Sequence, residues 1–118
     1  MNANRVRASR VLSAKDLKIP IEQDVTKVVS RFLTAAEGVA AHWVEYGKGV
    51  LLFVMAPGDN RSGAFYVYDR KQGNFWLLEP ADGVFGGYSI REMRRKIRQF
   101  RLLEFAANPA RLASAGPS

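Results

Sequence analysis

The sequence predicts an α+β fold in two layers, in which a four-stranded antiparallel meander lies between an N-terminal and a C-terminal helix. Apolar residues recur with helical spacing towards both ends of the chain, and four strand-length segments rich in β-branched and aromatic residues lie between them. Short turn segments separate these strands. Because connections this short join antiparallel neighbours, we expect the element order α-β-β-β-β-α.

The first 12 residues are polar and basic, and we expect them to form a flexible arm that carries Arg5, Arg7 and Arg10. Ser13 and Asp16 have the spacing of a capping box, in which each side chain bonds the backbone N–H of the other residue. At 118 residues the chain has the length of one domain, and we expect a single α+β domain over residues 13–108, followed by a flexible tail over 109–118.

The N-terminal helix is predicted from Pro20 or residue 21 onward. Pro20 suits a first helical position, where its missing N–H would be unpaired in any case. Glu22 and Asp24 then fall in the first turn, where the helix dipole favours acids, and Gly38 marks the end. The helical spacing is carried by Val25, Val28, Val29, Phe32, Leu33 and Ala36.

Four strands are predicted over residues 39–46, 50–56, 64–68 and 75–78. In the segment 50–56 both alternating sets of side chains are apolar, which is typical of a strand covered on both faces. The two helices can cover one face. The sequence leaves open whether residues 11–19 of the same chain or a partner, including a second copy, covers the other face.

The C-terminal helix is the strongest candidate for a functional surface. It is predicted to begin at the capping pattern of Ser89 and Glu92 and to end before Asn108 and Pro109. At about 100° per residue its apolar residues Ile90, Met93, Ile97 and Phe100 share one sector. A second sector, free of acids, contains Arg91, Arg94, Arg95, Arg98 and Arg101.

An arginine row of this kind suits an anionic partner, because the guanidinium group makes forked contacts to phosphate or carboxylate. The chain has a net charge of +7, and 12 of its 18 basic residues are Arg. Tyr66 and Tyr68 alternate on one predicted strand and are candidate stacking partners for unpaired bases. Arg5, Arg7 and Arg10 are candidates for further phosphate contacts.

Several classes of function are disfavoured. The chain has no Cys, which excludes disulfides, thiol catalysis and cysteine-based zinc sites. His42 stands alone, and nothing near Glu79 and Asp82 completes a metal or acid–base site, so we expect no catalytic residue, metal or cofactor. The glycines of segment 83–87 match no phosphate-binding fingerprint and are interpreted as turn residues. No apolar run reaches the length of a membrane span, and no secretory signal precedes residue 13, so we expect a cytoplasmic protein.

The sequence thus predicts a small, basic, non-enzymatic binding or accessory protein. The expected partner is nucleic acid, bound by the arginine face of the C-terminal helix. The alternative is a protein–protein interaction module or accessory subunit, which docks on an acidic protein surface through an apolar sheet face and the arginine helix.

Overall fold

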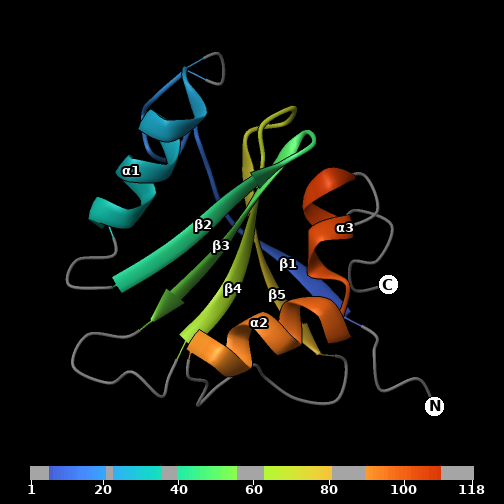
Figure 1. Cartoon of the computed structure of the whole chain (residues 1–118). Coiled ribbons are helices and arrows are strands. Elements are labelled where there is room, and N and C mark those ends of the chain that lie inside the picture. The colour runs from blue at the N-terminus through green and yellow to red at the C-terminus, as the bar shows by residue number, and fades with distance from the viewer. Residues whose placement is uncertain (1–5, 21–22, 36–39, 56–62, 81–89, 110–118) are drawn as a thin grey trace.

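In the computed structural model, which describes residues 6–20, 23–35, 40–55, 63–80 and 90–109, the chain folds into a five-stranded antiparallel sheet flanked by three helices (Figure 1). The elements are β1 (Val6–Ser13), α1 (Val25–Ala35), β2 (Ala40–Tyr46), β3 (Gly49–Met55), β4 (Gly63–Asp69), β5 (Asn74–Pro80), α2 (Ile90–Gln99) and α3 (Leu102–Ala107). The α+β class and the antiparallel sheet predicted from the sequence are confirmed.

The meander consists of β2, β3, β4 and β5, which are neighbours in chain order. Gly47 and Gly73 have positive φ values of 59° and 74° in the β2–β3 and β4–β5 turns, a conformation that glycine adopts without steric cost. Asp69 accepts hydrogen bonds from the backbone N–H groups of Lys71 (2.9 Å) and Gln72 (3.3 Å), which stabilise the second turn.

The expected number of four strands is wrong, because residues 6–13 add a fifth strand, β1, antiparallel to β5. Residues 6–12 are therefore not the flexible arm that their polarity indicated. Val6 and Ala8 are buried while Arg7 and Ser9 are exposed, so the segment alternates as an edge strand does. The register shifts between Arg10 and Leu12, as in a β-bulge.

The helices cover both faces of the sheet, and the expected two-layer arrangement is corrected to three layers (Figure 1). On one face α1 packs Val28, Val29 and Phe32 against the sheet, together with Ala14 and the partly buried Leu17. Phe32 stacks on Phe75 of β5, with ring centroids 4.4 Å apart. On the other face the sheet packs against α2 and α3. The chain itself therefore covers β3 on both sides.

Two local predictions near α1 have different outcomes. The capping box is confirmed: the Ser13 N–H donates to Asp16 Oδ2 (2.9 Å) and the Asp16 N–H donates to Ser13 Oγ (3.1 Å). The helix itself begins later than expected, at Val25. Asp24 is its cap rather than a member of its first turn, because Asp24 Oδ1 accepts a hydrogen bond from the Thr26 N–H (2.8 Å).

The C-terminal helix is two helices rather than one. Arg101 has left-handed backbone angles (φ 52°, ψ 44°), which end α2 and place the start of α3 at Leu102. At 100° per residue, Leu102 in an unbroken helix would lie about 20° from Arg91, within the arginine sector. The change of direction lets Leu102 and Ala106 turn towards the sheet, where both are fully buried.

Candidate nucleic-acid interface

Helix α2 lies across the end of the sheet where β3 ends and β4 begins (Figure 1). Met93 and Phe100 are buried in the core beneath it, and Ile97 is partly buried against the same core. These three residues recur with helical spacing, so their burial fixes which side of α2 faces the protein. The opposite side of the helix consequently faces outward.

The arginine face occupies that outward side. The structure exposes every side chain that the sequence assigned to it: Arg91, Arg94, Arg95, Arg98 and Arg101. In the described part of the chain no acid lies within ion-pair distance of these five guanidinium groups. Their charges therefore remain available to an external anion. The cost of keeping like charges at i,i+3 and i,i+4 is not offset by carboxylates of the described residues.

Arg101 belongs to the face but not to the helix. Its position in the left-handed junction places its side chain just past the end of α2. The neighbouring Lys96 is half-buried, with Nζ 5.7 Å from the centre of the Phe100 ring and 3.3 Å from Gln99 Oε1. Lys96 thus packs along the flank of α2, while the arginines project into solvent.

The N-terminal arginines lie on β1, a different part of the fold. Arg7 and Arg10 are both exposed on this edge strand, and Arg7 Nη2 lies 3.8 Å from Glu79 Oε2 of β5. The carboxylate of Glu79 compensates part of the Arg7 charge. Arg5 lies outside the described residues. Arg10 lies exposed on the sheet edge, and no acid of the described residues forms an ion pair with it.

The two tyrosines expected to stack on bases, Tyr66 and Tyr68, lie on the sheet face that α1 covers. Tyr68 is fully buried against Phe75, with ring centroids 4.6 Å apart, and Tyr66 is partly buried with its ring at 5.3 Å from that of Phe32. Both side chains belong to the core beneath α1. Burial raises the pKa of both hydroxyl groups; Glu79 adds to the effect at Tyr66, as does Asp69 at Tyr68.

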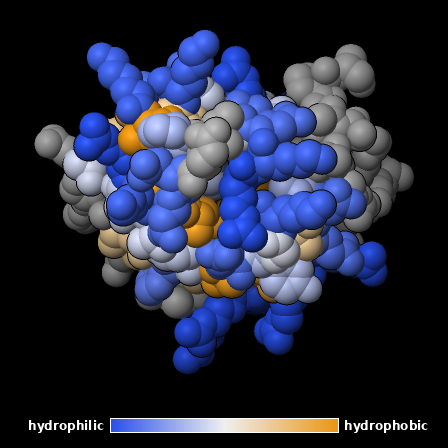
Figure 2. Space-filling model, turned by 90° about the horizontal axis from the view of Figure 1, so that it is seen from above, coloured by the Kyte–Doolittle hydropathy of each residue, from blue (hydrophilic) through white to orange (hydrophobic). Residues whose placement is uncertain are grey.

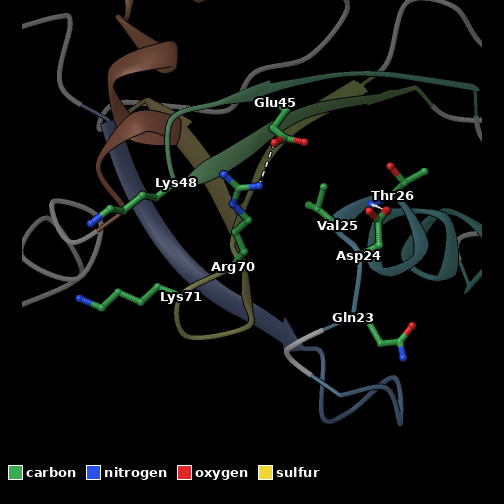
Figure 3. Close-up of a pocket in the computed structure, with 8 residues that line it drawn as sticks. All are labelled: Gln23, Asp24, Val25, Thr26, Glu45, Lys48, Arg70 and Lys71. Atoms are coloured by element: carbon green, nitrogen blue, oxygen red, sulfur yellow. Dashed lines mark hydrogen bonds and ion pairs between the residues drawn. The ribbon is translucent and has the colours of Figure 1, made fainter.

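A second charged region, which the sequence analysis did not identify, lies at the opposite end of the sheet, around an open hollow of about 570 Å³ (Figure 3). Arg70 Nη1 pairs with Glu45 Oε1 at 2.8 Å, and Arg70 Nη2 donates to the Gly47 carbonyl at 2.6 Å. The hollow is lined by Gln23, Asp24, Val25, Thr26, Glu45, Lys48, Arg70 and Lys71.

This hollow offers less positive charge than the arginine face. Glu45 compensates Arg70, and Lys48 and Lys71 extend away from the α1 end of the hollow (Figure 3). Figure 2 views the molecule from the end that carries the β2–β3 and β4–β5 turns, and hydrophilic side chains cover most of it. The signal in the sequence was the placement of Lys48, Arg70 and Lys71 in turns that the sheet brings to one end.

The residues considered for catalysis do not come together. His42 is exposed on β2, Glu79 pairs with Arg7 on the far side of the sheet, and Asp82 lies outside the described residues. The described ranges contain no cluster of three or more His, Asp or Glu side chains that could hold a metal ion. The glycine segment 83–87 and the Ser89 cap also lie outside the described residues.

None of the described helices has the length and apolar character that a membrane crossing requires. Comparison of the chain with protein-family models, with curated proteins and with solved structures gave no match.

Proposed function

We propose that this is a non-enzymatic protein that binds nucleic acid through the arginine face, formed by Arg91, Arg94, Arg95 and Arg98 of α2 and by Arg101 beyond it. One observation supports the proposal above all. These five side chains are exposed, on the outward side of a helix whose inner side is anchored in the core, and no acid of the described residues compensates them.

The chemistry of the arginine face suits a phosphate backbone. Guanidinium groups bind phosphate oxygens through two parallel N–H donors, and they stay charged at every physiological pH. Between Arg91 and Arg98 the helix rises about 10 Å, so successive side chains can follow neighbouring phosphates. Phosphates would also relieve the mutual repulsion of the arginines. Binding of this kind reads charge rather than base sequence.

Arg10 is a further phosphate contact in this proposal, and Arg7 a weaker one because Glu79 already pairs with it. Tyr66 and Tyr68 have no role in the proposal, since their rings are core residues. The alternative of a protein–protein interaction module now depends on a different observation. Both faces of the sheet are covered by the chain itself, so the observation that now favours an interaction module is the exposed edge strand β2.

The test compares two double variants that each remove two exposed positive charges from a helix. Arg94→Ala with Arg98→Ala alters the arginine face, and Lys27→Ala with Arg31→Ala alters the solvent side of α1. Affinity for a short DNA or RNA duplex is measured by fluorescence anisotropy at low salt. We expect the first variant to bind at least tenfold more weakly and the second to bind within about twofold of the unaltered protein.

Circular dichroism and thermal unfolding establish that both variants fold, which is expected because the altered side chains are exposed. An equal loss of affinity in the two variants would show that net charge, not the arginine face, determines binding. A dissociation constant no better than millimolar for DNA and RNA at low salt would end the proposal altogether.

A further inference from the structure

The edge strand β2 is exposed along almost its whole length. It bonds to β3 on one side and is last in the strand order, so its other side has no neighbouring strand in the described residues. The exposed fractions of Trp43, Val44 and Tyr46 are 37%, 49% and 47%. A strand of this kind presents unpaired backbone N–H and C=O groups beside apolar side chains, which favours pairing with another strand.

The opposite edge of the sheet is protected, and the comparison is informative. Strand β1 presents Arg7 and Arg10 to solvent and contains the register shift at Val11, and both features discourage edge-to-edge pairing. Strand β2 has no Lys, Arg or Pro, and its register with β3 is unbroken from Ala40 to Tyr46. The fold thus protects the β1 edge, whereas the described residues place no strand beside β2.

We propose that β2 pairs with β2 of a second copy of this chain, antiparallel and centred on Trp43, to form a two-fold symmetric dimer with a continuous sheet. The backbone supports this centre. Tyr46 and Gly49 flank the two-residue β2–β3 turn and form a hydrogen-bonded pair. Bonded pairs then alternate along the hairpin, so the backbone N–H and C=O groups of Ala41, Trp43 and Glu45 point away from β3. These are the groups that a symmetric partner centred on Trp43 requires.

The side chains suit the same register. Trp43 lies opposite Trp43 of the second copy, and an aromatic cross-strand pair is among the most stabilising. Glu45 lies opposite Ala41, so the two carboxylates are not directly opposed, and each keeps its ion pair with Arg70. A centre at Glu45 would instead oppose two like charges, which is destabilising. The small Ala40 lies opposite the large Tyr46 on the other face.

Cysteine cross-linking tests this register directly, because the chain contains no Cys. In Trp43→Cys the two thiols meet at the two-fold axis, where directly opposed Cα atoms are about 5.5 Å apart, within the range of a disulfide. In the control Tyr46→Cys, each residue is three positions from the axis, so the two Cα atoms lie about 20 Å apart. Under mild oxidation we expect a covalent dimer from the first variant and none from the second above the level of random collision.

The mass of the unaltered protein in light scattering provides a second test, with an expected value of twice 13.2 kDa. Val44→Lys places a charge on the open edge and should raise the dimer dissociation constant at least tenfold. Ser9→Lys adds the same charge to an exposed position of β1 and should leave the dimer intact. Thermal unfolding checks that both variants fold.

A monomeric unaltered protein at micromolar to millimolar concentration would overturn the dimer, as would efficient cross-linking of Tyr46→Cys or equal loss of the dimer in the two lysine variants. The dimer does not depend on the proposed nucleic-acid function. The variant Arg94→Ala with Arg98→Ala should still have the doubled mass, so failure of either proposal is recognised separately.

Discussion

Substitution of Gly49 by Ala tests the contact that holds the C-terminal helices on the sheet. Gly49 begins β3 and is buried beneath α3. A Cβ atom at this position would overlap the carbonyl oxygen of Ala106 and lie 3.0 Å from its carbonyl carbon. The obstacle is helix backbone, which no side-chain rotation can remove. Gly49 does not have a positive φ, so the expected cost is steric rather than conformational.

The magnitude follows from two opposing effects. Forcing an extra methyl group into a packed contact costs about 1–3 kcal/mol, and this overlap belongs at the upper end because α3 itself must shift. Alanine also lowers the conformational entropy of the unfolded chain, which stabilises the fold by about 0.4–1 kcal/mol. We expect a net loss of about 2 kcal/mol in the free energy of unfolding. For a chain of this size that corresponds to a decrease of about 8 °C in the melting temperature.

Urea unfolding followed by tryptophan fluorescence measures this change. The matched control is Lys48→Ala, an adjacent substitution at an exposed turn position, which should alter stability by less than about 0.5 kcal/mol. If Gly49→Ala is as stable as the unaltered protein, α3 does not pack on the start of β3. The anchoring of α2, which depends on the same helix pair, would then be in doubt.

The further predictions concern two buried polar side chains, Tyr68 and Asp69. Tyr68→Phe removes a fully buried hydroxyl that has no hydrogen-bond partner among the described residues. Urea unfolding should therefore show a gain of about 1 kcal/mol in the free energy of unfolding, and a loss would mean that the hydroxyl is bonded. Burial raises the pKa of Tyr68 above its ordinary 10.0, so its hydroxyl ionises at lower pH in the unfolded chain than in the folded one. The free energy of unfolding should therefore keep this contribution below pH 10 and fall as the pH rises beyond it. In Tyr68→Phe the fall should be less steep. Asp69→Ala leaves the Lys71 and Gln72 N–H groups without their acceptor and should cost about 2 kcal/mol, whereas Asp69→Asn keeps an acceptor oxygen and should cost less.

Local sequence patterns predicted most of the fold. The four strands of the meander lie within one or two residues of their predicted positions where described, because each is rich in β-branched and aromatic residues and is bounded by turn residues such as Gly47 and Gly73. Strand β1 was missed because only Val6 and Ala8 carry its inward face, and its basic outward residues resemble those of a mobile arm. Its order comes from pairing with β5, which is distant in sequence.

The candidate site was also predicted in part, because helical periodicity is a local pattern. Periodicity correctly placed Met93 and Phe100 inward and the arginines outward on α2. The end of the helix at Arg101 was missed, although the apolar phase changes there: Leu102 and Ala106 do not continue the stripe of α2. The burial of Tyr66 and Tyr68 depends on which sheet face α1 covers, and the local sequence does not encode that choice.

The salt dependence of nucleic-acid binding tests the central claim most directly. If the arginine face neutralises four or five phosphates of duplex DNA, a plot of the logarithm of the association constant against the logarithm of salt concentration has a slope of about −4. In the variant Arg94→Ala with Arg98→Ala the slope should fall to about −2, while in Lys27→Ala with Arg31→Ala it should stay near −4. A slope that is the same in all three proteins would contradict the account, because the phosphate contacts would then lie elsewhere.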